Sequence, residues 1–292
     1  MPCHFEKAES PGKAIQRVCR ERIAQARSRL RQSDHPAAVH SVRKEIKKLR
    51  AIIALVRGEI GKGVCHKATK SLHAAAKRLA APRDARVMLK AFEKLAGRDA
   101  ENFAGIAAAL KKHARRETRQ FRRDDAAAAA KHFLRKINRR LEGLSIRAAG
   151  WTAIEPGLRQ SYRRGREALK LARRQPLPGN FHAWRKHVKN LGYQLRLLCP
   201  KWPAATRAMT DKLEQLGEVL GDDHDLDLLK QFAAKLGAGQ AGDAAALRRL
   251  IEQLQKKLRA TALKIGRRLY ADVPAVVSLR MGRQWSDWHL EK

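Results

Sequence analysis

The chain has 292 residues, and its 64 Lys and Arg residues against 28 Asp and Glu residues give a formal net charge of +36. Such an excess makes a compact protein repel itself unless a polyanion or an anionic surface neutralises it. Hydrophobic residues make up 44% of the chain, enough to bury a core, which excludes a disordered basic tail. We therefore expect a folded protein with an anionic partner.

The cysteines and the N-terminus indicate a soluble cytoplasmic protein. Cys3, Cys19, Cys65 and Cys199 lie far apart and form no C-x-x-C pair, a pattern typical of reduced and unligated thiols. The first residues, MPCHFEKAES, contain no apolar targeting segment, and no run of about 18 apolar residues occurs that could cross a membrane. We expect no membrane partner. The sequence does not predict the oligomeric state.

The hydrophobic pattern predicts an all-α protein, because no segment shows the sustained alternation typical of a strand. Pro and Gly residues stand where helices should begin or end. The predicted helices of the first half are 13–31, 37–57, 63–80, 84–96 and 99–122, followed by an extra helix at 124–144. Those of the second half are 157–174, 181–199, 203–220, 226–237 and 243–270. Residues 271–292 form a C-terminal tail with two Trp residues, which either dock on the helices or contact a partner.

Two stretches of the chain recur in the same order. HSVRKEIKKLR at 40–50 aligns with HAWRKHVKNLG at 182–192, and LAAPRDARVMLKAF at 79–92 aligns with LGDDHDLDLLKQF at 220–232. This order indicates that the half-chain is duplicated. We predict one domain, 1–292, with a first repeat at about 13–145 and a second at about 150–270. Short connections between long helices favour a four-helix bundle in each repeat.

One helix in each repeat separates basic from apolar side chains. At about 100° per residue, four basic residues of each copy fall within an arc of about 60°, and an apolar seam lies on another arc. The basic stripes are His40, Arg43, Lys47 and Arg50, and His182, Arg185, Lys189 and Arg196, with Lys44 and Lys186 beside them. The apolar seams are Val42, Ile46, Leu49, Ile53 and Val56, and Trp184, Val188, Leu191, Leu195 and Leu198. Residues 181–199 contain no Asp or Glu, whereas an ordinary exposed face mixes both signs. We predict that the stripes bind an extended anion.

The histidine that begins each stripe is expected to be neutral in the free protein. Neighbouring cations lower the pKa of an imidazole, and a bound phosphate would favour its protonated form. A neutral imidazole can also donate a hydrogen bond to a phosphate oxygen. The alternative is a histidine whose hydrogen bonds are made by a neighbouring helix.

These motifs together resemble the CHAD family, the conserved histidine α-helical domain. The resemblance rests on H-x-x-R-x-x-x-K-x-L beginning at His40 and at His182, on the R-D and H-D elements at 83–84 and 224–225, and on GLRQSYRRGREAL at 157–169. It covers about residues 13–270. It implies two pseudo-symmetric four-helix bundles around a basic central pore or groove that binds inorganic polyphosphate, and, as for some members, a location on polyphosphate granules.

By position, the resemblance assigns polyphosphate binding to both stripes. Weaker candidates on the first and last helices of the repeats are Lys111, Arg115, Arg163, Arg166, Lys257 and Lys264. Gly192 departs from the pattern, because the first copy has Arg50 there, so the second stripe loses one cation. The E-x-E-x-K motif of the triphosphate-tunnel domain that some members carry is absent from the sequence, so no catalytic partner domain is implied.

An enzyme of the HD-type phosphohydrolase class is one competing interpretation, with His224 and Asp225 as its metal-binding pair. The aligned pair in the first repeat is Arg83 and Asp84, however, and arginine does not ligate metals. We therefore predict that Asp84 and Asp225 cap helices or orient cations, and we expect no metal, no cofactor and no catalysis.

Two binding functions also compete. A charge of +36 binds any polyanion, including nucleic acid, but aromatic residues are only 5% of the chain and the stripes offer almost none for base stacking. A phosphohistidine carrier resembles H-x-x-K-G, with Gly four residues after the histidine, where this chain has Lys44 and Lys186. Non-specific nucleic-acid binding is the stronger of these alternatives.

Overall fold

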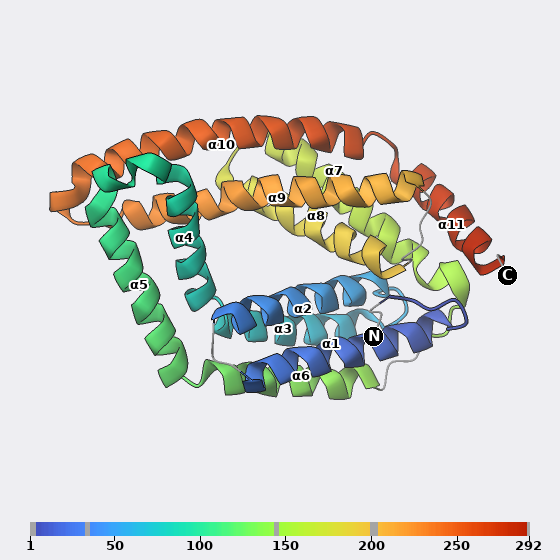
Figure 1. The fold of residues 1–292 in the computed structure, drawn as a ribbon. Helices are drawn as coiled ribbons and strands as arrows, with labels where there is room; N and C mark the ends of the chain where they lie inside the picture. Colours follow the sequence, from blue (N-terminus) through green and yellow to red (C-terminus); the bar gives the residue numbers. More distant parts are fainter. Residues whose placement is uncertain (1–3, 33–35, 143–145, 199–203, 291–292) are drawn as a thin grey trace.

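The computed structural model describes residues 4–32, 36–142, 146–198 and 204–290. Within these ranges the chain forms eleven α-helices and three 3-10 helices and no strand, which confirms the all-α class (Figure 1). The first-half helices are α1 (Pro11–Gln32), α2 (Pro36–Leu55), α3 (Lys62–Arg78), α4 (Ala81–Ala96), α5 (Ala104–Arg123) and α6 (Ala126–Glu142). The others are α7 (Glu155–Arg174), α8 (Pro178–Leu198), α9 (Ala204–Ala233), α10 (Ala241–Leu269) and α11 (Pro274–Leu290). The 3-10 helices are Gly97–Phe103, Gly150–Ala153 and Ala238–Gln240.

The prediction of two helices at 203–220 and 226–237 is wrong, because α9 runs unbroken from Ala204 to Ala233. The first repeat does break at the aligned place, between α3 and α4. Pro82 lies there, and a proline lacks the amide hydrogen and clashes with the carbonyl four residues earlier. The aligned residue of the second repeat is Asp223, which keeps its amide, so the helix continues.

The helices pack in two groups whose apolar seams are buried as predicted. Helices α1, α2, α3 and α6 form one group, and α7, α8, α9 and α10 form the other (Figure 1). The two groups meet where α2 packs against α8. The nine seam residues on α2 and α8, and Val56 directly after α2, are all at most 1% exposed. Leu49 and Leu195 belong to the same hydrophobic cluster, and the buried Gln194 amide donates to the carbonyl of Ala51 at 2.9 Å. One core therefore joins the two groups and fixes α8 against α2.

A second hydrophobic cluster lies away from this core. Helices α4 and α5 leave the first group and pack against the far ends of α9 and α10 (Figure 1). Phe92 and Ile106 from this hairpin share the cluster with Leu229 and Ile251. Helix α4 is thereby held against the C-terminal half of α9, although the two segments belong to different repeats.

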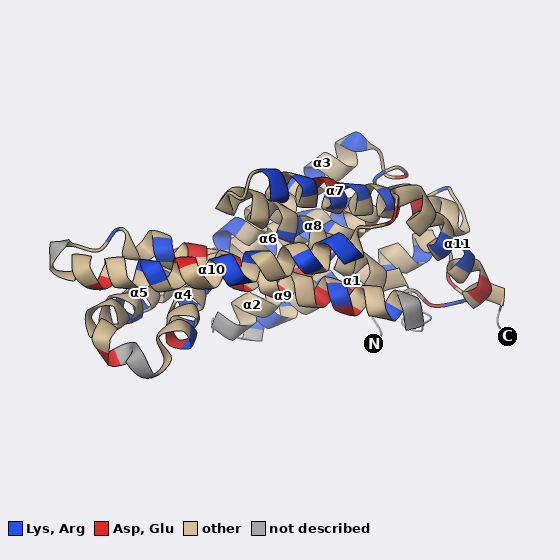
Figure 2. Ribbon diagram, turned by 90° about the horizontal axis from the view of Figure 1, so that it is seen from above, with Lys and Arg blue, Asp and Glu red and all other residues tan. Residues whose placement is uncertain are grey.

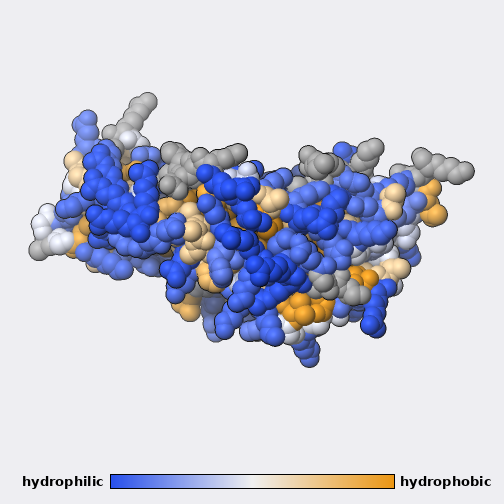
Figure 3. All heavy atoms as spheres, turned by 90° about the horizontal axis from the view of Figure 1, so that it is seen from below, coloured by the Kyte–Doolittle hydropathy of each residue, from blue (hydrophilic) through white to orange (hydrophobic). Residues whose placement is uncertain are grey.

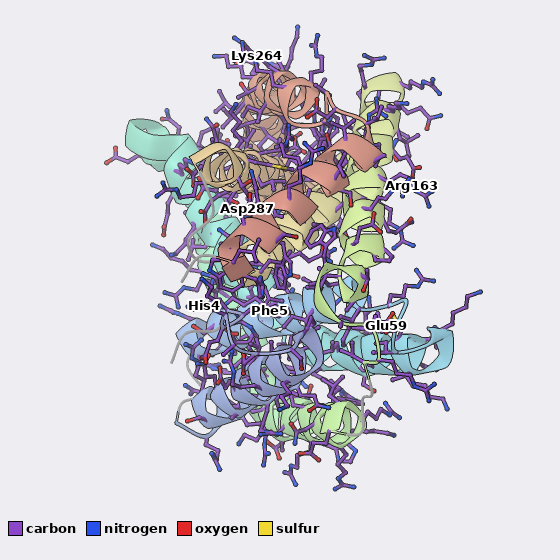
Figure 4. All side chains as sticks on the ribbon, turned by 90° about the vertical axis from the view of Figure 1, so that its right-hand side faces the viewer. His4, Phe5, Glu59, Arg163, Lys264 and Asp287 are labelled. Carbon is purple, nitrogen blue, oxygen red and sulfur yellow. The ribbon has the colours of Figure 1, made fainter. Side chains whose placement is uncertain are left out.

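Both ends of the described chain pack on the helices. The tail forms α11, where Trp285 is 4% exposed and its ring contacts Phe5 and Trp151. The Phe5 amide donates to the Leu197 carbonyl at 2.9 Å, and Figure 4 shows Phe5 where the two helix groups meet. The expectation that the tail docks on the helices is confirmed.

The described part of the chain also bears on two expectations from composition. None of its helices combines the length and hydropathy needed to cross a membrane. Cys19 and Cys65 are free thiols, Cys19 being buried, while Cys3 and Cys199 lie outside the described residues.

Candidate functional site

Two adjoining cavities lie where α2 and α8 pack against α3, α4 and α9. The larger has a volume of about 640 Å³ and the smaller about 470 Å³. Six side chains line both cavities, and we call them the central wall: Arg43, Lys47, Arg83, Arg185, Lys189 and Tyr193. Because five of the six are basic, the two cavities share a strongly cationic boundary.

Every predicted stripe residue lines at least one cavity. Outside the central wall, Arg50, His182 and Lys186 line the larger cavity. His40, Lys44 and Arg196 line the smaller one. The two leading histidines therefore lie in different cavities, His182 in the larger and His40 in the smaller.

The six weaker candidates lie elsewhere. Lys111, Arg115, Arg163, Lys257 and Lys264 are exposed, Arg166 is half-buried, and none of them lines either cavity. Figure 4 shows Arg163 and Lys264 at the outer edges of α7 and α10, and Figure 2 shows Lys and Arg along most outer helices. These residues belong to a basic outer surface.

Arg83 is a central-wall residue that the sequence motifs did not assign to binding. Its guanidinium donates to Asp84 at 3.0 Å and to Asp225 at 3.4 Å, and its side chain is only 11% exposed. Asp84 lies in the first turn of α4, whereas Asp225 lies inside α9 and caps no helix. Both carboxylates therefore orient a cation. The alignment of Arg83 with His224 in the sequence could have identified Arg83 as a site residue, because both side chains line the larger cavity.

Two imidazoles stack at the larger cavity. The ring centroids of His182 and His224 are 3.9 Å apart, with 31° between the planes. Burial, followed by the charges of Lys186 and Arg185, lowers the pKa of His182 to about 4. Burial and the neighbouring His182 lower the pKa of His224 to about 3. Both rings are therefore neutral at pH 7. In the smaller cavity, burial and Arg83 also lower the pKa of His40.

The central wall is crowded with cations. Burial lowers the pKa of Lys47 to about 7, and the charges of Arg185, Arg83 and Arg43 act in the same direction. Burial likewise lowers the pKa of Lys189, with contributions from Arg185 and Arg196. Burial and the neighbouring cations therefore disfavour the charged forms of these two lysines.

Buried donors in this region lack acceptors. Arg43 donates one N–H group to the Ala76 carbonyl at 2.6 Å, but its Nε has no hydrogen-bond partner among the described residues. The Nε of Arg185 and the Nδ1 of His182 are likewise buried without a partner there. An unsatisfied buried polar group costs about 1–3 kcal/mol, so the two arginine Nε–H groups are natural donors to an anionic oxygen, as is His182 Nδ1 in the tautomer that carries the proton there.

Two glycines of α9 make room for central-wall side chains. A Cβ atom at Gly217 would lie 2.7 Å from Cε of Lys189, and one at Gly221 would lie 3.4 Å from Nε of Arg185. A glycine inside a helix is less favourable than alanine by about 1 kcal/mol. At Gly217 the missing side chain leaves the space that the end of the Lys189 side chain occupies.

The site offers little to a metal ion. Across the described ranges, no group of three or more His, Cys, Asp or Glu side chains is placed to hold one. Asp225 is engaged by Arg83 instead, and burial raises its pKa against the opposing charges of Arg83 and Arg185.

Comparisons with known proteins agree with this architecture. Residues 14–234 match the model of the CHAD domain family. The crystal structure of the CHAD domain from the plant Ricinus communis superposes with a TM-score of 0.65 at 20% identity, covering 93% of this chain and 95% of that one. A search of curated proteins gave no match. The family match spans most of the chain, and the chain therefore belongs to the CHAD domain family.

Proposed function

We propose that the protein binds inorganic polyphosphate along the central wall and does not transform it. In this proposal the two repeats form pseudo-symmetric bundles, and the two cavities form one basic passage between them. The observation that carries it is the set of five basic side chains shared by both cavities, two of which keep buried Nε donors that have no partner in the described part of the chain.

The shape of the site favours a chain-like anion. The stripe from His182 to Arg196 extends about 21 Å at 1.5 Å per residue, longer than a single phosphate needs. An anion that meets many cations releases many counterions, so its affinity is high and falls steeply with salt. A phosphate chain also relieves the repulsion among Arg43, Lys47 and Arg185.

The lining favours polyphosphate over nucleic acid. Tyr193 is the only Phe, Trp or Tyr among the described residues that line the two cavities, so bases find little to stack on. An unbranched phosphate chain is narrow enough to lie along the wall, whereas a duplex would meet only the outer surface. Location on polyphosphate granules would follow from the same affinity.

A competition experiment tests this proposal. The purified protein is titrated with long-chain polyphosphate and with duplex DNA of equal total charge at moderate salt. We expect polyphosphate to bind far more tightly, because only it reaches the buried donors. Equal affinities would contradict the proposal and support non-specific binding by the outer surface.

A further inference from the structure

Both cavities have a basic lining, but one helix face in each differs in charge, being basic in the larger cavity and acidic in the smaller one. On α3, His73 and Lys77 line the larger cavity. On α9, Glu214 and Glu218 line the smaller one. All four side chains are exposed, and each pair is spaced four residues apart, so its members share one helix face.

These pairs occupy equivalent positions in the two repeats. When Leu79 is aligned with Leu220, His73 aligns with Glu214 and Lys77 with Glu218. Both pairs precede the place where the first repeat breaks at Pro82, in the stretch that is helical in both α3 and α9. The aligned positions are therefore basic in the first repeat and acidic in the second.

The acidic pair acts on cations of the smaller cavity. A carboxylate oxygen of Glu214 lies 3.0 Å from a guanidinium nitrogen of Arg196. Glu214 and Glu218 both act to raise the pKa of Lys189, against the stronger effects of burial, Arg185 and Arg196. An anion that enters through the smaller cavity therefore displaces the Glu214 carboxylate from Arg196 and passes the Glu218 carboxylate.

The larger cavity presents no such obstacle. Among the described residues that line it, Asp84 is the one carboxylate, and that group is paired with Arg83. In its lining, burial and the charges of Arg50 and Lys186 lower the pKa of His73. An anion that enters here meets no unpaired carboxylate among the described lining residues.

We propose that Glu214 and Glu218 form an acidic rim that makes binding one-sided, so that polyphosphate enters through the larger cavity and the rim limits how far it occupies the smaller one. This inference rests on the proposed function. The rim sets which chain lengths the site favours, because a short chain can lie wholly within the larger cavity.

The rim is tested with the double variant E214Q/E218Q. Its matched control is E167Q/E252Q, which removes two exposed carboxylates that pair with Arg163 and Lys230 and do not line the cavities. Both variants add the same net charge. We expect the rim variant to bind long-chain polyphosphate about fivefold more tightly than the control does, because Arg196 is released from Glu214 and two carboxylates no longer repel the anion in the smaller cavity. The slope of log affinity against log salt steepens by about one to two.

Tripolyphosphate is the length control. Its affinity for the rim variant should match its affinity for the charge control, because it does not need to reach the rim. A long-chain gain no larger than that of E167Q/E252Q, or an equal gain for tripolyphosphate, would overturn the rim. Wild-type protein in the same titration separates the two proposals, since wild-type affinity for polyphosphate no greater than for duplex DNA would contradict the proposed function itself.

Discussion

Lysine and arginine side chains occur on the outer helices and in the cavities, but their surroundings differ. Outside, Arg163 is 57% exposed beside Glu167, and Lys94 is 73% exposed and pairs with Asp222. In the cavities, the Nε groups of Arg43 and Arg185 are buried without a partner among the residues that the structure describes, and burial lowers the pKa of Lys47 to about 7. Figure 3 shows hydrophilic residues over most of one outer face. Charge alone therefore does not locate the site, whereas charge that is buried and unpaired does.

Among single substitutions, the largest loss of polyphosphate affinity is expected at Arg83. Arg83→Ala removes a cation from the central wall and leaves the carboxylates of Asp84 and Asp225 unpaired beside the ligand. We expect polyphosphate affinity to fall by about thirtyfold or more, since charge-assisted hydrogen bonds contribute about 1.5–3 kcal/mol each. Binding is measured by calorimetry.

The companion variant Arg83→Ala/Asp225→Asn should recover part of this loss, because it also removes one carboxylate. Circular dichroism melting confirms that each variant is folded. If Arg83→Ala lost no more polyphosphate affinity than the outer variant Arg163→Ala, binding by the central wall would be contradicted.

The pH dependence should also distinguish inner from outer cations. In the free protein, His182 has a pKa of about 4 and Lys47 a pKa of about 7, and a bound polyanion raises both. Binding then takes up protons at any pH between the free and bound pKa values, so affinity rises as pH falls. From pH 8 to 6 we expect a gain of about three- to tenfold.

Proton uptake is measured by calorimetry in two buffers of different ionisation enthalpy. The variant His40→Ala/His182→Ala should have a shallower profile, and Lys47→Arg should lose the slope above pH 7. A flat wild-type profile would remove the histidines and Lys47 from the mechanism.

A smaller effect is expected at Gly217. The variant Gly217→Ala places a methyl group against the end of the Lys189 side chain, which must move away from the wall. Affinity should fall about two- to fivefold, as one charge shifts. Stability should rise by up to about 1 kcal/mol, because alanine favours a helix more than glycine does.

Weaker binding together with higher stability would show that Gly217 is needed to make room for Lys189 and not to stabilise the helix. Gly63→Ala in α3 is the control, since no atom lies within 4 Å of the added Cβ. Unchanged binding in Gly217→Ala would mean that Lys189 does not contact the ligand.

The parts of this structure that could be predicted from sequence are those contained within one helix. The stripes and seams of α2 and α8 follow from 3.6-residue periodicity, so His40, Arg43, His182 and Arg185 were placed together correctly on their helices. The unbroken α9 was missed because its polar run around Gly221 resembles a loop. The ion pair of Arg83 with Asp225 joins segments 142 residues apart, which no local pattern encodes.

In the proposed function, cations buried in the central wall, and not total charge, bind the anion. A comparison of two variants that lose the same charge and the same residue type separates these two causes. Arg43→Ala/Arg185→Ala removes two cations from the central wall, and Arg115→Ala/Arg163→Ala removes two from the outer surface. In titrations with long-chain polyphosphate at moderate salt, we predict an affinity loss of at least about a hundredfold for the inner variant and at most about threefold for the outer one. Equal losses of affinity in two folded variants would contradict binding by the central wall.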